Sequence, residues 1–319
     1  MHHGEIDLET AQALQLLSAG IDQFELPSSK LDETLIVASW NIREFGKTPR
    51  PKKALHLVAE VLGQFDLISL VELRENMADV RQVLDYLGPY WQAVYSDSVD
   101  DWGGNWERLG FIFDKRAVQF NGFAGNVHPA RIKEGDEYLA EKSFWRPPYM
   151  ASFCSGNFDF IAISAHVRWG TSNVARQAEI SRFAEWLKKK TERKEVADSD
   201  VIVFGDFNTE GQDMVESMMK FGLKIPEPLV GVRTNVKETQ HYDHILYLPK
   251  DTDFRSFTNT GGVLKAWNKI GKKLFPGETE TAITYLLSDH YPIWMMLKTD
   301  NDQEERDQLI QRRKKTPGG

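Results

Sequence analysis

Apolar residues along the chain fall into two patterns: short continuous runs, and longer stretches with helical spacing. The runs are rich in β-branched and aromatic residues, which is typical of buried strands, and they lie at 33–42, 66–73, 91–97, 108–115, 150–156, 158–167, 200–208, 241–248 and 291–297. Apolar positions three and four residues apart predict amphipathic helices at 7–19, 52–65, 77–88 and 173–193. The pattern therefore predicts strands and helices mixed along most of the chain.

The length of the chain bounds its organisation. A chain of 319 residues can bury a core large enough to be stable without disulfide bonds. No proline- or glycine-rich linker divides the sequence, and it contains no internal repeat. We predict a helical extension at 1–33, a single folded domain at 34–298 and a charged, partly helical tail at 299–319.

Charge and cysteine content bear on where the protein works and what it binds. The formal net charge is −8, whereas a protein that coats nucleic acid without specificity is usually basic, so contact with nucleic acid would need a local basic patch. Cys154 is the single cysteine, so no intramolecular disulfide can form. The sequence shows neither a signal peptide nor an apolar run of the ~20 residues that a membrane helix needs. We expect a soluble, cytoplasmic protein with no membrane span.

Polar residues capable of chemistry mark the ends of five predicted strands. They are Asn41, Glu72, His166, Asp206 with Asn208, and the pair Asp289 and His290 just before the last strand. Each has a simpler explanation by itself, namely a solvated strand end, an Asx turn or a polar surface turn. Five such ends are hard to assign to chance, because strands that end together would gather these side chains in one place.

The residue types in this set suit metal-assisted chemistry on a phosphate. Oxygen ligands such as those of Asp206 and Asn208 favour Mg²⁺ or Mn²⁺. His166 and His290 titrate near neutral pH, and an adjacent carboxylate raises the pKa of a histidine and fixes its tautomer. Two such pairs would supply a base and an acid on opposite sides of a reacting phosphate. No zinc, P-loop or dinucleotide-binding motif competes with this interpretation.

The order of several short motifs extends this picture. The segments "SWNIREFG", "LVELRE", "NWERLGFIF", "SFWRPP", "ISAHVRWG", "FGDFN", "YDHI" and "SDHYPIW" follow one another at spacings that resemble the endonuclease/exonuclease/phosphatase superfamily, and most closely its deoxyribonuclease I branch. The resemblance spans about residues 34–298 and leaves 121–142 and 251–285 unexplained. It implies an α/β fold, a four-layer sandwich in which two packed mixed β-sheets are flanked by helices.

The resemblance also implies roles for individual residues. The implied metal site consists of Glu72 as the main ligand with Asn41, Asp206, Asn208 and Asp289, and its ion is Mg²⁺, with Mn²⁺ as an alternative. The implied catalytic residues are His290 with its partner Asp243, His166 with its partner Glu107, and Asp206 and Asn208. The residues that match phosphate-binding positions are Arg43, Arg74, Arg146, Asn41 and Asn208.

The resemblance favours one function and leaves others open. It implies a Mg²⁺-dependent phosphodiester hydrolase, and we expect a monomeric DNA endonuclease of low sequence specificity in which His290 is the base and His166 the acid. The same site would also serve a phosphatase or phosphodiesterase acting on a phospholipid headgroup, an inositol phosphate or a nucleotide. A binding protein that has lost catalysis is disfavoured, because the whole set of site residues is present.

Overall fold

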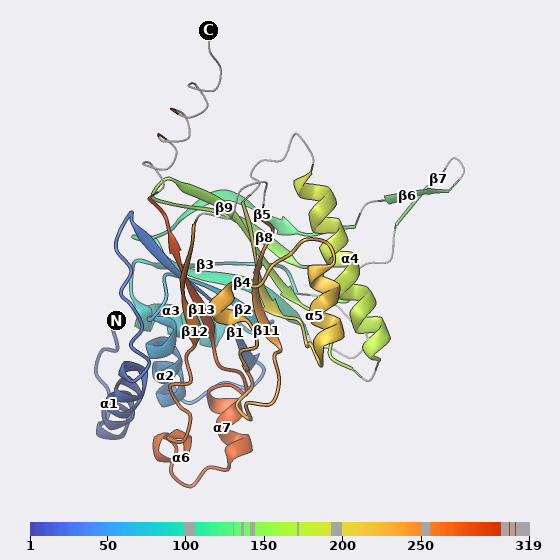
Figure 1. Cartoon of the computed structure of the whole chain (residues 1–319). Coiled ribbons are helices and arrows are strands. Elements are labelled where there is room, and N and C mark those ends of the chain that lie inside the picture. Colours follow the sequence, from blue (N-terminus) through green and yellow to red (C-terminus); the bar gives the residue numbers. More distant parts are fainter. Residues whose placement is uncertain are drawn as a thin grey trace.

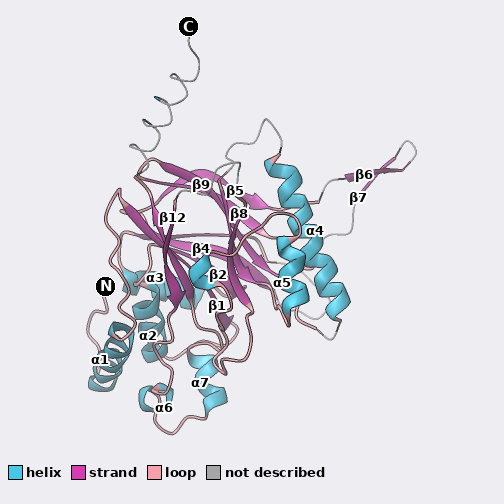
Figure 2. Ribbon diagram, in the orientation of Figure 1, coloured by secondary structure: helices cyan, strands magenta, loops and turns pink. Residues whose placement is uncertain are grey.

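Two β-sheets packed face to face form the centre of the molecule, and helices cover the outer face of each (Figures 1 and 2). The computed structural model describes residues 1–98, 106–129, 131–134, 137–140, 144–170, 172–192, 200–249, 256–300, 306 and 310. The predicted four-layer α/β sandwich is confirmed. No helix in this described part of the chain is long and apolar enough to cross a membrane.

Both sheets are mixed, as predicted. The six-stranded sheet has the order β12 (Phe257–Val263), β13 (Ile293–Lys298), β1 (Thr34–Phe45), β2 (Leu67–Arg74), β4 (Glu107–Asp114) and β3 (Trp91–Tyr95). The five-stranded sheet has the order β11 (Asp243–Tyr247), β10 (Val201–Asp206), β9 (Phe158–His166), β8 (Tyr149–Ser155) and β5 (Gln119–Asn126). Strands β1 and β2 are parallel, as are β9 and β10, and the other neighbours are antiparallel. A separate hairpin joins β6 (Arg131–Glu134) to β7 (Glu137–Ala140).

Three apolar cores separate the four layers. The helices over the six-stranded sheet are α1 (Leu8–Asp22), α2 (Lys52–Leu62), α3 (Ala78–Leu87), α6 (Gly271–Leu274) and α7 (Glu280–Leu286), and they enclose a core around Trp40. A second core, rich in phenylalanine, lies between the two sheets around Phe111 and Phe153. The helices α4 (Asn173–Thr191) and α5 (Gln212–Met219) close a third core over the five-stranded sheet around Phe183. A short 3-10 helix, η1, spans Glu227–Leu229.

The apolar pattern predicted the elements that carry apolar runs and missed short or polar ones. All nine predicted strands and all four predicted helices are present. Strands β5 and β12 were not predicted, because their sequences are polar and contain glycine and they are little buried. The hairpin strands β6 and β7 were not predicted either, because no apolar run marks them. Helices α5, α6 and α7 were missed because they have only eight, four and seven residues. Most of the predicted tail lies outside the described residues.

Candidate active site

The site lies where strands from both sheets meet at one edge of the sandwich. In the six-stranded sheet, Asn41 on β1 and Glu72 on β2 belong to parallel neighbours. In the five-stranded sheet, Asp206 at the end of β10 pairs in register with His166 of β9 and with Asp243 of β11. Because each parallel pair ends in the same direction, these side chains converge, as the sequence predicted.

A local irregularity in the strands positions Glu72. We predicted that Asn41 and Glu72 end their strands, and this is wrong, because β1 continues to Phe45 and β2 to Arg74. The strand pairing shifts register after Asn41 and around Glu72. Glu72 has a φ of +63°, which costs about 1–3 kcal/mol for a residue other than glycine. Bulges of this kind commonly re-aim a side chain next to an active site.

Hydrogen bonds fix the Glu72 carboxylate in this position. Asn41 Nδ2 donates to Glu72 Oε1 at 3.0 Å, and the backbone N–H of Glu44 donates to Glu72 Oε2 at 2.8 Å. Asn41 Nδ2 also donates across to Asp206 Oδ2 on the other sheet at 3.0 Å. Asn41 therefore links the acids of the two sheets.

Asp206 and Asn208 form an Asx turn, which is the structural explanation that their spacing allowed beside a functional one. The backbone N–H of Asn208 donates to Asp206 Oδ1 at 2.8 Å, and Asn208 has a φ of +49°. Gly205 allows the close strand approach that the motif predicted, because a Cβ there would lie 1.8 Å from the carbonyl oxygen of Ala165. The turn does not exclude a functional role, because it occupies Oδ1 and leaves Asp206 Oδ2 directed towards the other site residues.

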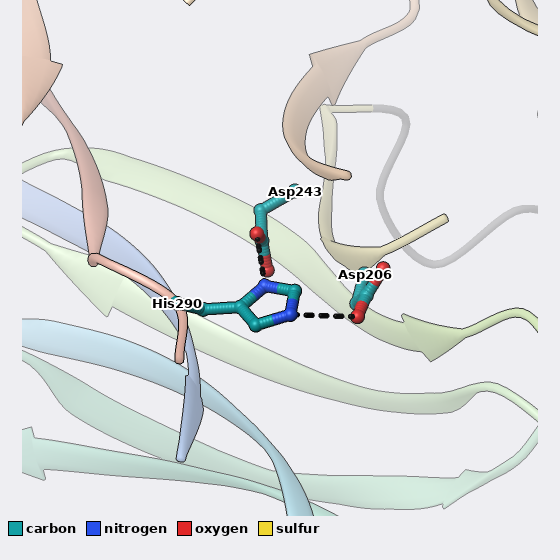
Figure 3. Close-up of side chains that lie close together, drawn as sticks. All are labelled: Asp206, Asp243 and His290. Carbon is teal, nitrogen blue, oxygen red and sulfur yellow. Dashed lines mark hydrogen bonds and ion pairs between the residues drawn. The ribbon is translucent and has the colours of Figure 1, made fainter. Parts of the chain in front are cut away.

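Two histidine–carboxylate pairs face Asp206 Oδ2, the oxygen that also accepts from Asn41. Asp243 Oδ2 lies 2.7 Å from His290 Nδ1, and Glu107 Oε1 forms the equivalent contact with His166 Nδ1. The Nε2 atoms of His290 and His166 each lie 3.9 Å from Asp206 Oδ2. Figure 3 shows the His290 ring held between Asp243 and Asp206. All five side chains are buried.

Further contacts hold the two carboxylates of these pairs. Thr234 Oγ1 donates to Asp243 Oδ2 at 2.5 Å. Arg146 Nε lies 2.7 Å from Glu107 Oε2, and Arg146 Nη1 is buried with no hydrogen-bond partner among the described residues. The Tyr242 ring stacks beside His290 with ring centroids 5.7 Å apart.

Burial and ion pairing together set the pKa values. Burial alone raises the pKa of Glu107, but the charges of His166 and Arg146 outweigh burial and lower it to about 2. Burial lowers the pKa of His290, whereas Asp243 and the other nearby acids raise it to about 10. Glu107 likewise raises the pKa of His166 against the effect of burial. Burial and the neighbouring Asp243 charge raise the pKa of Asp206. The protein's own charges thus favour protonated His290 at neutral pH.

The remaining candidates lie on the Glu72 side of the site. Arg43 stacks over the Tyr285 ring at 3.8 Å, and its Nη1 lies 3.4 Å from Asp289 Oδ2. Arg74 is buried, and its Nη2 lies 3.8 Å from Glu72 Oε2. Burial raises the pKa of Asp289. The structure therefore brings Asp289 and Arg43 together, and it directs Arg74 towards an acid of the site.

The donor atoms fit a hard divalent cation. Asp206, Asp243 and His290 place ligand atoms within 4.8 Å of one another, but Asp243 Oδ2 is already engaged by His290 and Thr234. Asn41 Oδ1 is buried with no hydrogen-bond partner among the described residues, and it belongs to the side chain that links Glu72 to Asp206. Free amide and carboxylate oxygens are what Mg²⁺ or Mn²⁺ prefers.

Three supporting residues were not found from the sequence. Arg176 is 1% exposed, and its Nη1 donates to the backbone oxygen of Asn208 at 2.7 Å. The sequence did contain a signal for Arg176. It lies four residues before Ile180, so helical spacing places this charged residue on the buried, apolar face of the helix. Glu44 and Thr234 act through contacts between distant segments, and nothing in their local sequence marks them.

A family model described as "Endonuclease/Exonuclease/phosphatase family" matches residues 38–264. The chain belongs to this family. Its members are phosphoester hydrolases, so the protein is an enzyme that hydrolyses phosphoester bonds. The family generally uses a divalent metal, and the buried acidic and histidine side chains described above could hold one. Comparison with curated protein sequences finds no match.

Solved structures of family members and related enzymes share the fold at low identity. D. rerio TDP2 in complex with a single-strand DNA product has a TM-score of 0.55 and 15% identity, covering 83% of this chain and 98% of TDP2. The human nocturnin catalytic domain with a bound sulfate anion has a TM-score of 0.53 and 14% identity, covering 86% and 98%. A mannosyl-6-phosphatase of Bacteroides thetaiotaomicron has a TM-score of 0.52 and 14% identity, covering 82% and 99%. At these identities the similarity supports the fold and leaves the substrate open.

Proposed function

We propose that the protein is a Mg²⁺-dependent phosphodiesterase that cuts DNA as a monomeric endonuclease with little sequence preference. The observation that supports this most directly is the pair of buried histidine–carboxylate contacts whose Nε2 atoms both lie 3.9 Å from Asp206 Oδ2. Hydrolysis of a phosphodiester needs a base for the attacking water and an acid for the leaving oxygen. The two histidines beside Asp206 Oδ2 would provide both.

In an in-line displacement, different residues of the chain would accept a proton from the attacking water and donate a proton to the leaving oxygen. His290 Nε2 accepts the proton of the attacking water, and the Asp243 carboxylate stabilises the imidazolium that forms. His166 Nε2 donates a proton to the leaving oxygen while Glu107 holds its ring in place. Arg146 Nη1, which has no partner among the described residues, is available to contact the phosphate. Asn208 is fixed by the Asp206 turn and by its Nδ2, which donates to the backbone oxygen of Val167 at 2.9 Å.

The proposed metal site consists of Glu72, Asn41, Asp206, Asn208 and Asp289. The unpartnered, buried Asn41 Oδ1 is the observation that supports a cation at this position. A bound Mg²⁺ would supply positive charge that stabilises the charge developing on the phosphate and lowers the pKa of the nearby histidines. Arg43 and Arg74 complete the proposed positive surroundings of the phosphate.

DNA is the favoured substrate for two reasons. A structurally similar protein, TDP2 of D. rerio, has been solved in complex with a single-strand DNA product. Arg43, Arg74 and Arg146 lie at or beside the site and would provide the local positive charge for a phosphate backbone that a chain with a net charge of −8 otherwise lacks. Both features fit a nuclease that recognises phosphates and makes few contacts to bases, which would give low sequence preference.

The experiment that tests this function compares substrates and variants side by side. Supercoiled plasmid, a phosphomonoester and a phospholipid are incubated with the enzyme and Mg²⁺, with EDTA as the metal-free control. We expect nicking of the plasmid that is lost with EDTA and in His290→Ala and His166→Ala. His128→Ala removes an exposed histidine and serves as the matched control. Release of phosphate from a small substrate without nicking would contradict the nuclease and support a phosphatase.

A further inference from the structure

A cavity of about 250 Å³ lies beside the candidate active site, between the loop that joins β1 to α2 and the helix α7. The lining residues that matter for its chemistry are Arg43, Glu44, Lys47, Arg50, Tyr285 and Leu286. Tyr285 belongs to the segment 251–285, which the resemblance to the nuclease family leaves unexplained. The cavity is thus built by a part of the chain without an assigned role.

The charges around the cavity favour an anion. Arg43, Lys47 and Arg50 are cationic, and Glu44 is the one acid among the described lining residues. Lys47 Nζ lies 2.7 Å from Glu44 Oε1, which offsets that negative charge. Lys47 is 57% exposed at the rim, so it can turn towards a ligand at little cost.

Arg50 is the buried member of this set, with only 8% of its surface exposed. Its Nε donates to the backbone oxygen of Tyr285 at 3.0 Å, and its Nη2 donates to the backbone oxygen of Arg43 at 2.7 Å. Burial lowers the pKa of Arg50 to about 10, so the guanidinium stays charged at neutral pH. These two bonds fix the guanidinium group against the cavity wall.

One nitrogen of the Arg50 guanidinium group makes no hydrogen bond to the described residues. This nitrogen, Nη1, is buried. A purely structural arginine would be expected to find acceptors for all its donors, because a buried donor of a charged group without a partner is costly. A buried cation with a free donor at a cavity is the arrangement expected where an anionic ligand completes the hydrogen bonding.

The cavity shares a wall with the candidate active site. Arg43 lines the cavity, and its Nη1 lies 3.4 Å from Asp289 Oδ2 in the site. Glu44 also lines the cavity, and its backbone N–H donates to Glu72 Oε2 at 2.8 Å. Arg43 and Glu44 therefore connect the cavity to the candidate active site.

We propose that Arg50 and Lys47 bind the phosphate that neighbours the one being cleaved, so that the enzyme prefers a strand carrying consecutive phosphates over a small phosphoester. This inference rests on the proposed nuclease function and narrows its substrate. The neighbouring phosphate accepts hydrogen bonds from Arg50 Nη1 and from the Lys47 ammonium. Arg43, stacked on Tyr285, separates the two phosphates.

The test varies the charge of the neighbouring phosphate. The substrate is an oligonucleotide with one cleavable phosphodiester whose neighbour, on the 5′ or the 3′ side, is either a charged phosphorothioate or a neutral methylphosphonate. We expect the wild-type KM to rise about tenfold for the neutral neighbour on one side only. In Lys47→Gln and Arg50→Lys this ratio of KM values should fall below about twofold.

The control variant and a second readout keep the result interpretable. Lys30 is 72% exposed and lies just before β1, at the end of the strand opposite the site, so Lys30→Gln should keep the full tenfold ratio. Arg50 also anchors the loop to α7, so the melting temperature of Arg50→Lys is measured beside the kinetics. Lys47→Gln removes only an exposed side chain and carries the test if Arg50→Lys does not fold.

The possible failures are distinguishable. If the KM is the same for a charged and a neutral neighbouring phosphate, on the 5′ side and on the 3′ side, this inference is wrong. The proposed nuclease function would not be affected by that result. An undiminished ratio in Lys47→Gln and in folded Arg50→Lys would also overturn this inference. If no oligonucleotide is cleaved while a small phosphoester is hydrolysed, the proposed function fails, and this inference fails with it.

Discussion

Asp206 Oδ2 accepts a hydrogen bond from Asn41 and lies at equal distance, 3.9 Å, from the outer nitrogens of His166 and His290. The two histidines are held by different acids, Glu107 and Asp243, on different strands. The residues therefore form two separate histidine–carboxylate units around one carboxylate. Replacing the acid of one unit should affect that unit's histidine first.

This separation allows the base and the acid to be told apart. Asp243 raises the pKa of His290, so Asp243→Asn should lower that pKa and reduce kcat about 10²–10⁴-fold. If His290 is the base, activity rises with pH through its pKa, and the variant shifts this acidic limb of the pH–rate profile to lower pH. If it is the acid, activity falls above its pKa, and the basic limb shifts to lower pH instead.

The partner variant provides the check on this assignment. Glu107→Gln removes the carboxylate that raises the pKa of His166, so it should move the limb that Asp243→Asn leaves in place. The measurement is the pH dependence of kcat with saturating Mg²⁺ for both variants and the wild type. The same limb moving in both variants would contradict the model of two separate units.

His244 gives a prediction about acid stability. It is buried beside Asp243 with its Nε2 2.8 Å from Thr209 Oγ1, and burial lowers its pKa from 6.5 to about 4. The unfolded chain therefore takes up this proton at a higher pH than the folded protein. The stabilisation is complete above pH 6.5 and is lost as the pH falls towards 4.

We expect this one residue to account for a loss on the order of 2–3 kcal/mol in the free energy of unfolding across that pH range. Urea unfolding of the wild type and of His244→Gln at several pH values measures the difference between their slopes. His128→Gln, at an exposed position, should behave like the wild type. Parallel pH dependence in the wild type and His244→Gln would contradict the prediction.

At the scale of elements, the sequence predicted the strands well and their irregularities not at all. Apolar runs located β1, β2 and β10, because these strands are buried on both faces. The bulge at Glu72 left no trace in the sequence, because it depends on how β2 pairs with its two neighbours. The glycine before Asp206 was the one local signal of a close approach.

Gly205 makes this close approach testable. Its φ of +143° and the 1.8 Å that would separate a Cβ from the Ala165 carbonyl oxygen exclude any other residue without backbone movement. We expect Gly205→Ala to cost about 3 kcal/mol or more in stability and to displace Asp206, with loss of activity. Gly125→Ala is the matched control, since no atom lies within 4 Å of its Cβ position, and it should change stability by less than about 0.5 kcal/mol.

At the scale of the whole molecule, motifs predicted which residues would gather at the candidate site but not how the sheets bring them together. The convergence of His166 and His290 on Asp206 depends on the packing of β9 and β10 against the six-stranded sheet. Contacts across this interface, such as the 2.8 Å hydrogen bond between Ser69 Oγ and Ser164 Oγ, leave no pattern in either strand. The cavity beside the site likewise exists only once α7 packs against the β1–α2 loop.

Metal binding should stabilise the whole molecule, because the proposed ligands come from both sheets. Glu72 is on the six-stranded sheet and Asp206 on the five-stranded one, and a cation shared between them opposes their separation on unfolding. At a Mg²⁺ concentration a hundred times its Kd, we expect a gain of about 2.7 kcal/mol, seen as a higher melting temperature than in EDTA. Glu72→Gln should lose this gain. Because the folded protein lowers the pKa of Glu72 despite its burial, through hydrogen bonds from Asn41 and Glu44 among other contacts, the variant should also be less stable in EDTA, so each variant is compared with itself with and without Mg²⁺. Asp85→Asn, an exposed acid on α3, should keep the gain. An undiminished rise in melting temperature in Glu72→Gln would place the metal elsewhere.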